Sequence, residues 1–208
     1  METEQKKQEV QEIENAILDS IIEIRSDPVV KDETENFPWT MYVSKKNNKD
    51  VYSLYLYDEI YDPQYYSKLF EIIRKLQKND ALDIHLNSPG GSLTTLVAFV
   101  NVLQESDATV TMYIDGFAES AAAILAFTGD ELVIREHSSI MFHNIHTGGI
   151  ILQDSGKIKA NIESMHRVYK HMLETFCSSV LTSRQINNII KKGSEVYYSG
   201  AELLKKLS

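Results

Sequence analysis

LDIHLNSPGGSLTTLVAFVNVLQ, residues 82–104, is the stretch of this chain that says most about its fold. Its first residues alternate between apolar and polar, as in a strand, and the Pro-Gly-Gly that follows is typical of a tight turn. Beyond the turn, Leu93, Leu96, Val97 and Val100 recur at spacings of three and four, which is the pattern of an amphipathic helix. The stretch therefore predicts a strand, a turn and a helix in direct succession.

The same alternation continues on both sides. Upstream, VYSLYLYDEI (residues 51–60) reads as a strand and is followed by a helical pattern up to residue 80. Downstream, the strand ATVTMYID (108–115) leads into the small-residue helix AESAAAILAFTG (118–129), and ELVIRE (131–136) adds a further strand. Strands that alternate with helices imply right-handed crossovers, so we expect an α/β fold with a mostly parallel sheet.

The two ends of the chain differ from this centre. Residues 1–26 show an amphipathic stripe and predict a helix, which leads through an acidic, proline-containing linker to a globular domain starting near Met41. We thus divide the chain into residues 1–40 and 41–208. After the central repeats, a long amphipathic helix is expected at about 152–180, then two short helices around a strand-like EVYYS. The stripe of the first helix consists of Val10, Ile13, Ile17, Ile21 and Ile24.

Composition limits the function classes. The net charge of −9 argues against nucleic-acid binding, which needs clustered Lys and Arg. A single cysteine, Cys177, allows no intrachain disulfide, and its helical surroundings favour a buried structural thiol. Neither an apolar run of membrane-spanning length nor a secretory signal pattern is present, so we expect no membrane association and a cytoplasmic location.

Three segments could carry chemistry. Ser120 follows a strand and opens a helix made of small residues, where free backbone amides could stabilise an oxyanion. The glycine turn at 87–91 joins another strand to another helix, and His143 follows an apolar run, with His146 three residues on. A neutral imidazole beside a serine hydroxyl would make it nucleophilic. Taken singly, each is also compatible with a purely structural role. Ser120 could belong to a packing face, the glycines could form an ordinary turn, and His143 could be a hydrogen-bonded histidine at the rim of the core.

Cofactors are not expected in this chain. The histidines have no metal-binding spacing such as HExxH, and neither GxGxxG nor GxxxxGK[ST] occurs, so we predict no metal, no nucleotide site and no ATPase activity of its own.

Together, these segments resemble the Clp protease proteolytic subunit, a serine peptidase family with a crotonase-like fold. The resemblance runs from about Val51 to Leu204. It rests on LDIHLNSPGG, which is similar to the family's INSPGG segment, on GFAESAAA, similar to its GxAAS segment, and on SSIMFHNIHTGG, similar to its strand, histidine and Gly-Gly pattern.

The resemblance implies a set of roles. Ser120 would be the nucleophile and His143, rather than His146, the general base, with the backbone amides of Gly91 and Ala121 as the oxyanion hole. The function implied is that of an ATP-dependent serine endopeptidase that cleaves unfolded proteins or peptides inside a chamber of stacked rings, for example heptameric ones. ATP would be used only by a partner unfoldase of the AAA+ class. The long helix after residue 149 looks like the family's handle region, which makes contacts between rings.

The sequence departs from the family pattern at two acidic positions. The family's third triad member, an aspartate four residues before a Ser or Thr, falls on Glu195 here, whose extra methylene must be accommodated. Glu119 stands where the family has a small residue, and its carboxylate would repel an oxyanion if it pointed inward.

These departures keep two alternatives open. One is a noncatalytic ring subunit or scaffold. The other, less favoured, is an acyl-CoA hydratase or isomerase on the related crotonase fold, for which the carboxylate of Glu119 is the best argument.

Overall fold

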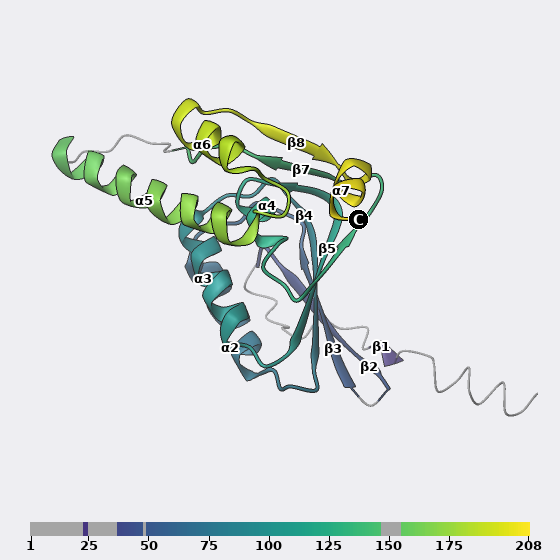
Figure 1. Cartoon of the computed structure of the whole chain (residues 1–208). Helices are drawn as coiled ribbons and strands as arrows, with labels where there is room; N and C mark the ends of the chain where they lie inside the picture. Colours follow the sequence, from purple (N-terminus) through teal and green to yellow (C-terminus); the bar gives the residue numbers. More distant parts are fainter. Residues whose placement is uncertain (1–22, 25–36, 48, 147–154) are drawn as a thin grey trace, which may run out of the picture.

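A computed structural model of the chain describes residues 23–24, 37–47, 49–146 and 155–208, which build one eight-stranded sheet with helices against it (Figure 1). The strand order is β1-β2-β3-β4-β5-β7-β8, and β6 also pairs with β5. The strands span β1 Glu23–Ile24, β2 Thr40–Lys46, β3 Lys49–Leu56, β4 Ala81–Ser88, β5 Thr109–Glu119, β6 Glu131–Ile134, β7 Ser139–Phe142 and β8 Val196–Ser199. The pairings among β3, β4, β5, β6 and β7 are all parallel, so the predicted α/β fold with a mostly parallel sheet is confirmed.

The helices follow the strands as the alternating pattern predicts. They are the 3-10 helix η1 Pro63–Tyr66 and the α-helices α2 Ser67–Lys75, α3 Leu93–Glu105, α4 Ala121–Leu125, α5 Ser155–Phe176, α6 Ser183–Lys192 and α7 Gly200–Leu207. In Figure 1, α2 and α3 lie side by side along one face of the sheet, while α5 extends away from the body of the molecule. Side-chain caps fix several starts: the hydroxyl of Ser92 accepts from the Thr95 amide before α3, and Thr182 forms a capping box before α6.

The core lies between the sheet and these helices. Alternate residues of β4 and β5 point toward it and are fully buried, among them Leu82, Ile84, Leu86, Met112 and Ile114. They pack with buried residues of α2 and α3 in a single hydrophobic cluster. The sheet is thus anchored by its helix-covered face, which fixes the ends of β4 and β5 relative to each other.

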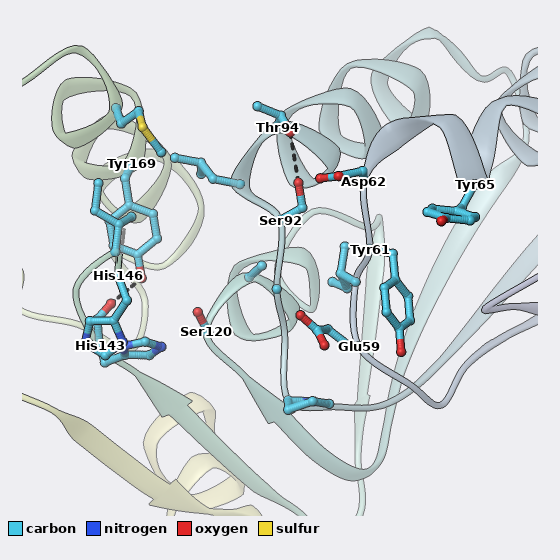
Figure 2. A pocket seen from close by; sticks show the side chains of 17 residues that line it. Glu59, Tyr61, Asp62, Tyr65, Ser92, Thr94, Ser120, His143, His146 and Tyr169 are labelled. Atoms are coloured by element: carbon cyan, nitrogen blue, oxygen red, sulfur yellow. Dashed lines mark hydrogen bonds between the residues drawn. The ribbon is translucent and has the colours of Figure 1, made fainter. Parts of the chain in front are cut away.

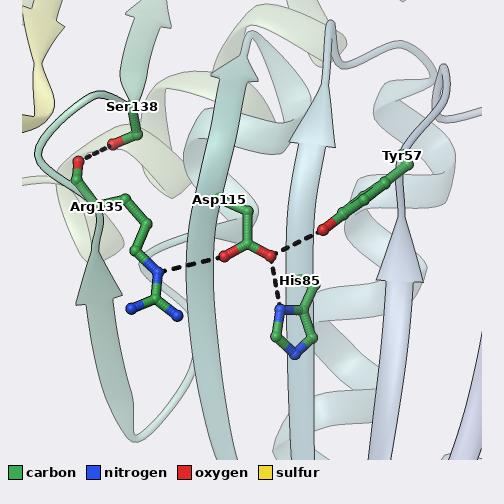
Figure 3. A network of polar contacts seen from close by, with 5 residues as sticks. All are labelled: Tyr57, His85, Asp115, Arg135 and Ser138. Atoms are coloured by element: carbon green, nitrogen blue, oxygen red, sulfur yellow. Dashed lines mark hydrogen bonds and ion pairs between the residues drawn. The ribbon is translucent and has the colours of Figure 1, made fainter.

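The opposite face of the same strands carries polar and aromatic side chains (Figure 3). The His85 ring is stacked between Tyr55 and Tyr113, with ring centroids 4.6 Å apart on each side. Its Nδ1 donates to the Asp115 carboxylate at 2.7 Å, and this carboxylate also accepts from the Tyr57 hydroxyl at 2.9 Å. Arg135 lies 3.5 Å from the other carboxylate oxygen, so this group ties β5 to β4, to β6 and to the end of β3.

Two strand features differ from the sequence expectation. Strand β2 had no predicted counterpart, and it forms an antiparallel pair with β3. Strand β5 continues beyond Gly116 to Glu119, because Phe117, Ala118 and Glu119 pair with β7. The extension places Ser120 directly at a strand end.

The N-terminal prediction can be compared with the structure at only one place. Glu23 and Ile24 form a strand that pairs antiparallel with Lys45 and Ser44, so the expected helix over residues 1–26 is wrong at Ile24, where pairing with the β2 edge replaces helical packing. The remainder of that helix and nearly all of the linker lie outside the described residues. Where the globular domain begins stays a prediction, although Trp39, two residues before Met41, is already buried in the core.

Two further expectations concern single residues and helix composition. Cys177 is fully buried, and this burial raises the pKa of its thiol, which confirms a structural thiol. Within the described part of the chain, none of the helices combines the length and the apolar composition that a bilayer crossing requires.

Candidate active site

The glycine turn after β4 lies against the end of β5. Gly90 has φ +85°, and a Cβ placed there would lie 2.3 Å from the carbonyl oxygen of Glu119 and 2.8 Å from the amide nitrogen of Ala121. A side chain at this position would therefore collide with backbone, so glycine is required for both its conformation and its lack of bulk. The close approach brings the two sequence segments side by side at the carboxyl ends of neighbouring parallel strands, where such sheets bind ligands.

Ser120 occupies a strained turn between β5 and α4. Its φ of 55° and ψ of −117° lie outside the regions that non-glycine residues prefer, which costs about 1–3 kcal/mol. Its amide donates to the carbonyl of Met141 in β7 at 2.8 Å, which holds the turn in place. Although Ser120 stands at the N-cap position, its hydroxyl caps no amide of α4, so the oxygen is available for chemistry.

Ser120 and His143 line one cavity of about 680 Å³. Figure 2 shows them on facing sides of it, with the serine hydroxyl directed toward the side of the histidine. Gly91, Ala121 and His146 line the same cavity. The structure thus brings together four of the five predicted site residues, although no hydrogen bond links the Ser120 hydroxyl to the His143 ring among the contacts of the described residues.

Gly91 and Ala121, the two predicted oxyanion donors, line this cavity, and neither amide donates to an acceptor among the hydrogen bonds of the described residues. The Ile60 amide donates to the Gly90 carbonyl and the Ser92 amide donates to the Ile60 carbonyl, both at 2.7 Å. This short parallel bridge therefore does not use the N–H of Gly91. Ala121 is the first residue of α4, and its N–H has no acceptor within the helix. Both N–H groups are therefore open to a ligand oxygen.

His143 follows β7 and is held through its backbone. The Tyr169 hydroxyl of α5 donates to the His143 carbonyl at 2.6 Å. Burial and the neighbouring His146 lower the pKa of the His143 ring, and they outweigh the carboxylates of Glu195 and Glu119, which act in the opposite direction. The ring is thereby kept neutral near pH 7, as a general base requires.

The imidazole and the expected third member of the triad are not joined. In the β7–β8 ladder Phe142 pairs with Val196, so the next step of the register sets His143 opposite Glu195. The Glu195 carboxylate nevertheless accepts a hydrogen bond from the Tyr197 hydroxyl at 2.8 Å, while Nδ1 of His143 is buried without a partner among the described residues. The triad role of Glu195 therefore stays a prediction.

Glu119 does not take the inward position considered above. Its side chain is absent from the cavity lining formed by the described residues, and its backbone carbonyl lies against Gly90. Its carboxylate opposes the lowering of the His143 pKa and adds to the raised pKa of Tyr197. Glu119 is therefore not among the described residues that face the cavity of Gly91 and Ala121.

Two site residues were not found from the sequence. Tyr169 supports the His143 backbone from a helix 26 residues away, and Tyr197 binds Glu195. The only sequence signal was that Tyr197 lies two residues after Glu195, on the same face of a strand. No cluster of three or more His, Cys, Asp or Glu side chains that could hold a metal occurs in the described ranges.

An α/β sheet with a strained serine, a histidine and two free amides in one cavity has the features of a serine hydrolase. The model of the Clp protease family matches residues 42–202, and the chain belongs to this family of serine peptidases.

Curated relatives agree with this assignment. The ATP-dependent Clp protease proteolytic subunit 1 of Rhodococcus jostii is 33% identical over 106 residues, which are 49% of this chain and 48% of that subunit. Subunit 2 of Chlamydia trachomatis is 27% identical over 164 residues, covering 74% and 79%. Subunit 1 of Rhodopirellula baltica is 31% identical over 150 residues, covering 68% and 64%. The match thus spans about half of the Rhodococcus subunit.

Among solved structures, a peptidase from Plasmodium falciparum has the same fold. It superposes with a TM-score of 0.58 at 16% identity, over 74% of this chain and 91% of that chain.

Proposed function

We propose that the chain is a serine endopeptidase subunit in which Ser120 is the nucleophile and His143 the general base. The observation that carries the proposal is the strained Ser120 turn, packed against Gly90 in a cavity that His143 also lines. A plain packing serine has no need of an unfavourable backbone, and such strain concentrates at functional sites.

The proposed reaction is acyl transfer in two halves. Ser120 Oγ attacks the peptide carbonyl carbon and its proton passes to the His143 ring, while the amides of Gly91 and Ala121 stabilise the oxyanion. Collapse of the tetrahedral intermediate breaks the C–N bond, and His143 gives its proton to the leaving amine. Water then hydrolyses the acyl ester by the same steps, and Glu195 orients the imidazole and stabilises its charged form.

The cavity also supports a peptide substrate. Tyr61, Tyr65 and Met165 line the same cavity as the serine and offer apolar surface, which suits the side chains of an extended, unfolded segment. We further propose, from the family resemblance described in the sequence analysis, that the chain works as an oligomer of stacked rings in the cytoplasm and receives substrate from an ATP-dependent unfoldase. ATP would be hydrolysed by that partner, and the chain itself would need neither cofactor nor metal.

The experiment that tests the proposal is labelling with a fluorophosphonate, followed by intact mass and peptide mapping. We expect one adduct per chain on Ser120 and none in Ser120→Ala. Ser92→Ala is the matched control, because Ser92 lines the same cavity but caps α3, and it should still be labelled. An adduct elsewhere, or no adduct at all, would contradict the nucleophile assignment.

A second candidate function is a noncatalytic ring subunit. It is favoured by one observation, namely that His143 Nδ1 lacks a partner while Glu195 is bonded to Tyr197. An absent adduct on a properly assembled oligomer would favour this reading. The hydratase alternative loses its main support, since Glu119 does not line the cavity.

A further inference from the structure

Tyr197 lies in strand β8, and Glu195 is the residue just before the strand begins at Val196. The Tyr197 hydroxyl donates to Oε2 of Glu195 at 2.8 Å, so the carboxylate is drawn along its own strand. In the ladder, Tyr197 lies opposite Met141 in β7, and the register sets Glu195 opposite His143 two residues further on. The phenol and the imidazole are therefore placed to compete for one carboxylate.

The imidazole lacks what the carboxylate could provide. Nδ1 of His143 is buried and has no hydrogen-bond partner among the described residues. Leaving a buried polar atom unpaired is unfavourable, while the exposed Tyr197 hydroxyl can bond to water instead. Rotation of the Glu195 side chain would exchange one hydrogen bond for the other, which makes two arrangements accessible to the same backbone.

We propose that Tyr197 is a positioning residue that holds Glu195 away from His143 in the free protein. In the engaged arrangement the Tyr197–Glu195 hydrogen bond is broken and His143 Nδ1–H donates to the carboxylate. No proton is transferred in this exchange. The inference rests on the proposed function, in which His143 is the general base and Glu195 its orienting carboxylate. Tyr197 is not among the described residues that line the cavity of Ser120 and His143.

The surroundings of His143 define what the exchange would change. His146 lies with its ring centroid 4.6 Å away, Glu195 and Glu119 are the carboxylates that act on the ring, and the Tyr169 hydroxyl bonds the backbone carbonyl. Burial and His146 now lower the pKa of His143. Bringing the Glu195 charge onto Nδ1 would favour the imidazolium and raise that pKa.

The test compares Tyr197→Phe with Tyr198→Phe. Tyr198 is the matched control, because its hydroxyl donates to the Val180 carbonyl and accepts from Gln185, away from Glu195. In full-length protein, we expect Tyr197→Phe to label with fluorophosphonate about three- to tenfold faster than wild type, the range expected for one exposed hydrogen bond. Tyr198→Phe should label at the wild-type rate, and Tyr197→Phe should give no gain when Glu195→Gln is also present.

A second readout does not depend on activity. In Ser120→Ala protein, the His143 ring is titrated by NMR, with its signal assigned by comparison with His143→Gln. We expect Tyr197→Phe to raise the His143 pKa and Tyr198→Phe to leave it unchanged. If Tyr197→Phe raises the His143 pKa but fluorophosphonate labels none of the variants, the proposed function would be overturned and the role of Tyr197 upheld. An unchanged or lower pKa, or slower labelling in Tyr197→Phe, would overturn the role of Tyr197.

Discussion

At the scale of single residues, the two histidines of the cavity form a natural comparison. Both His143 and His146 line it, but Nδ1 of His143 has no partner among the described residues, and one further step of the β7–β8 register would set His143 opposite Glu195. We expect His143→Gln to lower the rate of peptide cleavage by at least about 100-fold, which is the usual contribution of general acid–base catalysis. His146→Gln should retain most of the activity.

The pH profile gives a further check on His143. A general base acts in its neutral form, so activity should rise as the pH increases through the His143 pKa. Because burial and His146 lower that pKa, the rise should have its midpoint below the ordinary value of 6.5. His146→Gln removes the neighbouring ring that lowers the pKa and should shift the midpoint upward. A midpoint that stays above 6.5 in the wild type would contradict the environment described for His143.

At the scale of secondary-structure elements, the Asp115 group on the face of the sheet opposite α2 and α3 connects several strands (Figure 3). Partial burial alone would raise the pKa of Asp115, but the hydrogen bonds from His85 and Tyr57 and the nearby Arg135 together lower it. We expect Asp115→Asn to reduce the free energy of unfolding by about 1–3 kcal/mol at pH 7, measured by urea denaturation.

The pH dependence of this loss follows from the direction of the shift. A carboxyl group whose pKa is lowered on folding stabilises the fold above its unfolded pKa, 3.8 here, and ceases to do so as the pH falls through the folded value. The difference between Asp115→Asn and wild type should therefore shrink below pH 3.8. Asp83→Asn is the control, because burial raises the pKa of Asp83, so it should cause no loss at pH 7. Equal effects of the two substitutions would refute the assignment.

Local patterns predicted α3 well but not the helix after Ser120, which was expected over residues 118–129 and covers only Ala121–Leu125, since Ala118 and Glu119 belong to β5. The helix expected at about 92–104 is α3, Leu93–Glu105, because apolar spacing and the Ser92 cap are encoded within a few residues. Strand β5 was expected to end before Gly116, but it continues to Glu119 because β7, 20 residues later in the chain, pairs with it. Long-range pairing of this kind leaves no mark on local periodicity.

The same distinction applies to the candidate site. Ser120, His143 and the glycine turn could be selected from the sequence because each directly follows a strand with its own local pattern. The Tyr197–Glu195 hydrogen bond could not be predicted, since it depends on the rotamer of the Glu195 side chain and on which of the nearby donors bonds to its carboxylate. The position of Glu119 outside the cavity lining depends likewise on how β5 is extended.

At the scale of the whole molecule, helix α5 protrudes from the body of the protein, which leaves much of the helix uncovered (Figure 1). Its main contacts with other elements are with α4 and α6, and the sequence resemblance implies a role for this region in contacts between rings. If stacked rings form, the half-buried Ile162 near the free end should meet a partner ring. We expect wild type to form a large oligomer of the 23.7 kDa chain and Ile162→Asp to have half that mass by light scattering.

Asn161→Asp adds the same charge at an exposed neighbour and should leave the mass unchanged, because a charge matters only where it must be buried. A monomeric wild type would contradict the proposed chamber, and equal masses for all three proteins would place the contact between rings elsewhere than at Ile162.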